Sequence, residues 1–118
     1  MKHLLIIFTL LLTSVIWSKD VYYDDLVLRK GNGEFRLWYE KFSDVPFTGT
    51  IIGRTQGKIV DGKEQGEHLY YYESGQLWER TNYKDGKKEG EQFYYHENGD
   101  LNITNIYKDN KLIETIKH

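Results

Sequence analysis

The side chains in this chain best suited to chemistry are aromatic rings at regular spacing. Rings at alternate positions of neighbouring strands would form a row along one face of a sheet. The members of this candidate row are Tyr70, Tyr72, Trp78, Tyr94 and His96. Such rings can stack against sugars, and tyrosine and tryptophan are also common anchors of protein interfaces. The alternative is that they only cover the sheet, because cross-strand aromatic pairs stabilise sheets as well.

A tandem duplication separates two kinds of ring in this row. Residues 62–85 read GKEQGEHLYYYESGQLWERTNYKD and residues 86–109 read GKKEGEQFYYHENGDLNITNIYKD. The segments are identical at 12 of 24 aligned positions without a gap, which marks an internal repeat. Tyr70 and Tyr94 are counterparts, which favours a structural role. Trp78 is matched by Asn102 and is therefore the better candidate for a site-specific role.

The other reactive side chains lack the patterns that catalysis or metal binding requires. His68 and His96 fall at different positions of the repeat, whereas a metal site needs converging ligands. The absence of cysteine excludes disulfides and cysteine-ligated zinc. Recurring glutamates such as Glu67 and Glu91 are expected to pair with lysines of the repeat, not to form a catalytic carboxylate pair. We therefore predict no enzymatic activity, no cofactor and no metal site.

Turn signals between the aromatic runs predict an all-β fold, an antiparallel meander with two strands per repeat. A 24-residue unit is too thin to bury its own apolar side, so stacked hairpins should form an elongated, twisted, largely single-layer sheet. The turn pairs are Ser74-Gly75, Asp85-Gly86, Asn98-Gly99 and Asp109-Asn110, and such pairs favour two-residue hairpin turns. The expected strands are residues 36–42, 50–52, 58–60, 67–72, 77–83, 92–96, 101–107 and 112–117.

Alternation along these strands suggests a packed face and a wetter face. The wetter face should carry the candidate ring row among polar side chains such as His68, Arg80 and Gln92. The packed face is expected to carry Leu69, Tyr71, Leu77, Tyr83, Phe93, Tyr95, Leu101, Ile103 and Tyr107.

The first eighteen residues have the layout of a secretory signal peptide. A short basic start at Lys2 and His3 precedes an apolar run from Leu4 to Leu12, and Ser18 is a plausible cleavage position. The alternative, an uncleaved anchor, is disfavoured because the run is shorter than the ~20 residues of a membrane-spanning helix. Cleavage would leave 15 basic and 18 acidic residues, a net charge of −3 that does not favour nucleic-acid binding.

The remaining chain divides into a lead-in and a repeat region. Residues 19–35 should be irregular, with one edge strand near residues 25–29 or a poorly ordered start. Residues 36–61 are expected to form a degenerate unit that caps the array. The repeats at 62–85 and 86–109 then lead into a partial unit at 110–118.

The repeat unit resembles the MORN-variant repeat. Gly62, Lys63, Gly66, Tyr70, Tyr71, Gly75, Leu77, Tyr83, Lys84 and Asp85 carry the resemblance, and their counterparts in residues 86–109 repeat it. The resemblance implies hairpins stacked into an elongated, twisted sheet that serves protein or membrane contacts, with no enzymatic residues. Bacterial proteins with this repeat are often labelled as antitoxins of toxin–antitoxin pairs.

These observations predict an exported, non-enzymatic module that binds a protein partner at the cell envelope. The first alternative is a cell-wall or polysaccharide binder that uses the aromatic row. The second is a cytoplasmic antitoxin, in which residues 1–18 would not be a signal peptide. No nucleic-acid partner and no membrane span after signal cleavage are expected.

Overall fold

The computed structural model describes residues 19–31, 33 and 35–118, and within them the fold is all-β, as predicted. The expected signal peptide lies outside these residues. A short 3₁₀ turn, η1, covers Tyr23–Asp25. The strands are β1 (Lys19–Tyr22), β2 (Leu26–Lys30), β3 (Arg36–Glu40), β4 (Gly49–Ile52), β5 (Thr55–Val60), β6 (Lys63–Tyr71), β7 (Leu77–Lys84), β8 (Lys87–Tyr95), β9 (Leu101–Lys108) and β10 (Lys111–Lys117).

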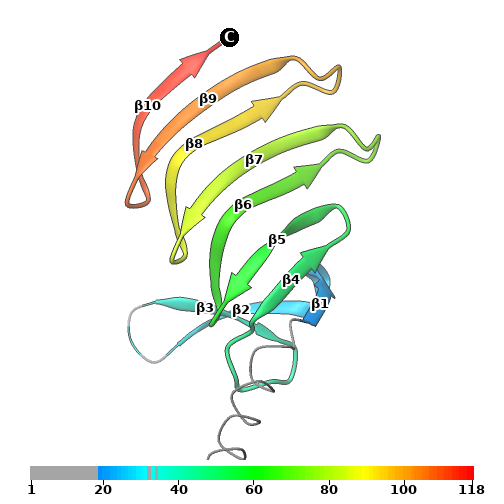
Figure 1. Ribbon diagram of the computed structural model, residues 1–118, viewed down its shortest axis with the longest axis vertical. Helices are drawn as coiled ribbons and strands as arrows, with labels where there is room; N and C mark the ends of the chain where they lie inside the picture. Colours follow the sequence, from blue (N-terminus) through cyan, green and yellow to red (C-terminus); the bar gives the residue numbers. More distant parts are fainter. Residues whose placement is uncertain (1–18, 32, 34) are drawn as a thin grey trace, which may run out of the picture.

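Eight of these strands form one sheet in the order β1-β4-β5-β6-β7-β8-β9-β10. From β4 to β10 each strand pairs antiparallel with the next, which is the expected meander (Figure 1). β1 instead pairs parallel to β4. Figure 1 shows the sheet bending as the strands rise from β4 to β10.

The N-terminal region is more ordered than the sequence predicts. The expected irregular lead-in contains β1 and β2, and β2 pairs with β3 in a separate two-stranded hairpin. This hairpin crosses the lower end of the large sheet (Figure 1), so the single layer becomes double there. We call β1, η1, β2, β3 and the described residues that link them as far as residue 48 the cap.

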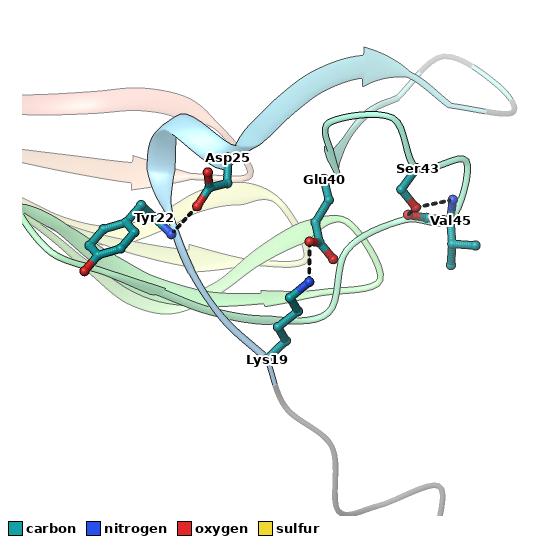
Figure 2. Close-up of polar contacts among 6 residues, drawn as sticks. All are labelled: Lys19, Tyr22, Asp25, Glu40, Ser43 and Val45. Atoms are coloured by element: carbon teal, nitrogen blue, oxygen red, sulfur yellow. Dashed lines mark hydrogen bonds and ion pairs between the residues drawn. The ribbon is translucent and has the colours of Figure 1, made fainter.

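Polar contacts hold the cap together. The Lys19 ammonium lies 2.6 Å from the Glu40 carboxylate and joins the start of β1 to the end of β3 (Figure 2). In Figure 2 the amide of Tyr22 also donates to Oδ2 of Asp25 at 3.1 Å, which fixes the turn between β1 and β2. The amide of Val45 donates to the Ser43 hydroxyl at 3.2 Å and orders the loop after β3.

The hairpin turns follow the sequence signals with one correction. At Asp85-Gly86 and Asp109-Asn110 both residues have positive φ, 50° and 79° and then 48° and 68°, as a two-residue turn requires. Asp61-Gly62 has the same form. The Ser74-Gly75 and Asn98-Gly99 turns are longer than predicted, because in each only the glycine has positive φ. The Tyr72 amide bonds to the Gln76 carbonyl, and the His96 amide bonds to the Asp100 carbonyl.

Two further glycines lie inside strands. Gly66 in β6 and Gly90 in β8 have φ of 74° and 84°, and the pairing register shifts between Thr81 and Tyr83, opposite Gly90. These are β-bulges, which bend a strand and increase its twist. Strands β6 and β8 therefore start at Lys63 and Lys87, four or five residues before the predicted starts.

Replacing Gly90 with alanine should lower the free energy of unfolding by about 1–2 kcal/mol, the cost of left-handed backbone for a residue with a Cβ. No atom lies within 4 Å of the added Cβ, so the loss would be backbone strain alone. Urea denaturation measures it. Gly90→Asn should cost less, because asparagine tolerates this conformation. Equal losses for both variants would contradict this explanation.

The apolar core lies in the cap and the first strands that it covers. Val21, Leu26, Phe47, Ile51 and Ile59 form one buried cluster, and Trp38 packs against it. Ile59, with 1% of its surface exposed, is the most buried of them. The cap therefore supplies the largest part of the hydrophobic stabilisation at one end of the repeat array.

The predicted packed face of the repeats is wrong in part. The register places Leu69 opposite Arg80 and His68 opposite Thr81, so alternation puts Tyr83 on the same face as His68. We call the face of His68, Thr81 and Tyr83 the cap-side face, because the cap lies over its first strands. Leu69 and Phe93 belong to the other face, where they are half-buried.

The buried centre of the cap-side face is polar. Gln92 donates from Nε2 to the Thr81 hydroxyl at 2.9 Å and accepts from Nδ2 of Asn105 at 3.1 Å. The Thr115 hydroxyl donates to Oδ1 of Asn105 at 2.8 Å. This chain crosses β7, β8, β9 and β10, and it satisfies groups that would otherwise be costly to bury. Neighbouring hairpins are thus joined by hydrogen bonds as well as by apolar contacts.

Candidate functional site

Three of the five predicted site residues form one aromatic cluster. The Trp78 ring centroid lies 6.2 Å from that of Tyr72 and 6.1 Å from that of Tyr94. The interplanar angles are 49° and 54°, so the rings are tilted against one another. We call Tyr72, Trp78 and Tyr94 the aromatic cluster. It combines residues of β7, β8 and the turn after β6 on a well-paired part of the sheet.

Trp78 stands in the cluster because of a β-bulge. Tyr70 pairs with Glu79 and Tyr71 with Leu77, which leaves Trp78 as the extra residue between them. The second copy repeats this irregularity but carries Asn102 there. Trp78 keeps 43% of its surface exposed. The ring that only the first copy carries is therefore open to solvent.

The neighbours of Trp78 are held by hydrogen bonds. The Tyr72 hydroxyl donates to the Tyr95 carbonyl at 2.7 Å and ties the turn to β8. Burial, followed by the negative charge of Glu79, raises the pKa of the Tyr94 hydroxyl, which therefore stays protonated beside that carboxylate. Both tyrosines are half-buried. The cluster is thus an anchored apolar platform whose exposed member is Trp78.

The other two predicted residues lie elsewhere. Tyr70 lies at the cap end of the cap-side face, beside Tyr83 and His68. His96 is exposed, and its amide and carbonyl close the turn through Asp100 and Gly99. The recurrence of Tyr70 and Tyr94 at equivalent repeat positions predicted the same structural role for both. The structure gives them different neighbours, so only Tyr94 joins the aromatic cluster.

Carboxylates in the repeats form surface ion pairs. Two of them pair with arginines and not with the predicted lysines. Glu67 lies 3.9 Å from Arg80, and Glu73 lies 3.7 Å from Arg54. Within the described part of the chain, no group of three or more histidine, cysteine or acidic residues is placed to hold a metal ion. The same residues include no helix long and apolar enough to cross a bilayer.

His68 was expected on the wetter face but is 1% exposed. Its Nε2 lies 2.8 Å from the Lys58 carbonyl, which can only accept, so the proton is on Nε2. The ring packs edge-on against Tyr83 with centroids 5.1 Å apart. Burial lowers the pKa of His68 below its ordinary value of 6.5, so the ring is neutral at pH 7.

This burial predicts an acid-sensitive fold. The unfolded chain takes up a proton at His68 near pH 6.5, whereas the folded chain does so only at lower pH. The stabilisation is therefore complete above pH 6.5 and is lost as pH falls from there through the lower folded-state pKa. His68→Gln, which copies the Gln92 counterpart, should flatten the pH dependence of urea unfolding, and His96→Gln should leave it unchanged. A steep acid loss that persists in His68→Gln would contradict this.

A second candidate site was not predicted from the sequence. A cavity of about 220 Å³ lies between the cap and the first repeat, where Tyr23 and Trp38 of the cap face Tyr70 and Tyr83 of the sheet. Glu64 lies in its wall and accepts a hydrogen bond from Nε1 of Trp38 at 2.7 Å. The sequence shows only that Tyr23 and Trp38 lie outside the repeat. Their approach to Tyr70 and Tyr83 depends on long-range packing of the cap, which no local pattern predicts.

Comparison with known families identifies the repeat. Residues 64–85 and 88–115 match the family model described as the MORN repeat variant. The matched segments begin two residues inside each of the copies found by sequence identity, and the second extends into β10. Searches of curated proteins and of solved structures gave no match.

Proposed function

We propose that this chain, which carries two MORN-variant repeats, is an exported, non-enzymatic module that binds a protein partner at the cell envelope. Repeats of this family are generally non-catalytic binding modules. The aromatic cluster is the observation that supports this proposal most strongly. Its exposed member, Trp78, packs between two half-buried tyrosines and has no aromatic counterpart in the second copy, whereas a purely structural ring would be expected in both.

A protein partner suits the cluster better than a glycan does. Tilted rings make an uneven apolar surface, into which side chains of a partner can pack, whereas a row that stacks along a sugar chain needs rings of similar orientation. Tryptophan and tyrosine surrounded by polar groups are typical of the centre of a protein interface. The neighbouring carboxylate of Glu79 adds a polar rim that can pair with a partner's donors.

Trp78→Ala tests this role. If Trp78 is an interface anchor, its loss should cost at least about 2 kcal/mol, or roughly a thirtyfold fall in affinity. A pull-down from envelope extract, followed by titration of the captured protein, measures the effect. Leu112→Ala is the control, because Leu112 is 54% exposed on β10 and outside the cluster.

The polysaccharide alternative predicts that Trp78 is needed to bind cell wall, not to bind a protein. Sedimentation with purified cell wall would remove wild-type protein from solution and leave Trp78→Ala behind. Our proposal predicts that neither wild type nor Trp78→Ala sediments with the glycan, and that only wild type retains its protein partner. A glycan-dependent loss in the Trp78 variant would overturn the choice of partner.

Export is proposed from residues 1–18 and is tested by the mass of the protein isolated from its host. Cleavage after Ser18 would leave Lys19 as the first residue. A mass that retains residues 1–18, together with a cytoplasmic location, would favour the antitoxin alternative.

A further inference from the structure

The cavity beneath the cap has the composition of a cation-binding cage. Four aromatic residues line it: Tyr23 and Trp38 from the cap, and Tyr70 and Tyr83 from β6 and β7. The rings of Tyr23 and Trp38 meet edge to face with centroids 5.5 Å apart. Ile51 and Ile59 supply the apolar part of the lining. Aromatic faces attract cations within about 6 Å through their quadrupoles.

The one charged side chain among the described residues that line this cavity is negative. No lysine or arginine lies among the described residues that line it, and Glu64 is the only acidic one. His68 lines it as well and is neutral, because burial lowers its pKa. Burial, together with the charges of Glu79 and Glu64, raises the pKa of Tyr70 to about 12, which keeps its hydroxyl uncharged.

Glu64 has spare capacity for a ligand. Its Oε1 accepts from the Trp38 indole, and no side chain of the described residues donates to Oε2 within hydrogen-bond distance. The indole bond also fixes the carboxylate against one wall of the cavity. A positively charged guest would face one carboxylate and several ring faces without displacing a protein cation.

We propose that this cavity binds a small organic ammonium ion, with Glu64 balancing its charge and the four rings surrounding its alkyl groups. Quaternary ammonium groups are recognised by aromatic cages of this composition. At about 220 Å³ the cavity is smaller than the ~300–1,000 Å³ typical of sites for drug-sized ligands, so it suits a head group or a simple amine. This site shares no residue with the aromatic cluster and does not depend on the proposed partner.

The test uses choline and its neutral carbon isostere, 3,3-dimethyl-1-butanol, on the isotope-labelled full chain. The indole N–H signal of Trp38 reports on the cavity, and that of Trp78 reports on the aromatic cluster. We expect choline to shift the Trp38 signal saturably at millimolar concentration, with the Trp78 signal unchanged. The isostere should produce no saturable shift. If the isostere binds as tightly as choline, or if choline leaves Trp38 unmoved, the cavity is not a cation site.

Glu64→Gln separates charge from shape. Glutamine keeps an oxygen acceptor for the Trp38 indole but removes the charge, so choline affinity should fall about tenfold or more, which corresponds to about 1.4 kcal/mol. Glu67→Gln is the matched control, because Glu67 is an exposed acid on the opposite face of the same strand. Equal affinity in Glu64→Gln and wild type would overturn the proposal. An unchanged Trp78 signal confirms that each variant is folded.

Discussion

Replacing Ile59 with alanine should lower the free energy of unfolding by about 2–5 kcal/mol, the range for large-to-small changes in packed cores. Ile59 is 1% exposed and belongs to the cluster that joins the cap to β4 and β5. Few other apolar side chains are fully buried, so few neighbours could move into the cavity that the substitution would leave. Chemical denaturation followed by tryptophan fluorescence measures the loss, since Trp38 packs against this cluster.

Ile116→Ala is the matched control for this prediction. Ile116 lies on β10 and is 39% exposed, and a surface substitution of this kind usually changes stability by less than about 0.5 kcal/mol. If both isoleucine variants lost stability equally, the apolar stabilisation would be spread along the repeats and not concentrated at the cap.

Gly57→Ala is expected to be the second severe change. A Cβ at Gly57 would lie 2.5 Å from three atoms of the His68 imidazole, far inside van der Waals contact. The ring cannot move away easily, because it is buried and Nε2 bonds to the Lys58 carbonyl. Overpacking of this kind costs about 1–3 kcal/mol, and occasionally more. Urea unfolding of the single variant measures the cost.

A double-mutant cycle assigns this cost to the ring. In the His68→Ala background the methyl group at residue 57 has space, so Gly57→Ala should cost clearly less than in wild type. Residues in direct contact show coupling free energies of about 0.5–3 kcal/mol. Strictly additive losses would mean that the glycine is needed for its backbone conformation and not for the approach of His68.

Local sequence signals predicted the strands and two of the four expected two-residue turns. Asp85-Gly86 and Asp109-Asn110 adopt the positive φ values that their residue types favour, and strands lie between the turns as expected. These features depend on a few neighbouring residues. The cap does not, because β1 pairs with β4 about thirty residues later and no local pattern encodes that parallel pairing.

The faces of the repeats were harder to predict. Alternation within one strand shows which residues share a side, but the relation between two strands depends on bulges such as that at Gly90. Both faces also carry aromatic residues, so hydropathy does not decide between them. Burial of Gln92 and Thr81 follows from their mutual hydrogen bond, which composition cannot reveal.

Part of the candidate site was predictable for a related reason. Trp78 was singled out because its repeat counterpart is Asn102, and the structure places it beside Tyr72 and Tyr94. The inclusion of Tyr70 and His96 followed from alternation alone. Tyr70 does share a face with Tyr94, because both pair with Glu79, but it lies beside Tyr83 and His68 instead of Trp78. His96 belongs to an exposed turn, which a count of positions does not reveal.

The most direct test of the binding role is site-specific crosslinking in the host cell. A photoreactive benzophenone side chain at position 78 would report what contacts the aromatic cluster, and the same group at position 42 would serve as control. Phe42 is fully exposed in the cap. We predict one discrete protein adduct from position 78 and none of that mass from position 42. Identical adducts from both positions, or no protein adduct at position 78, would contradict the account.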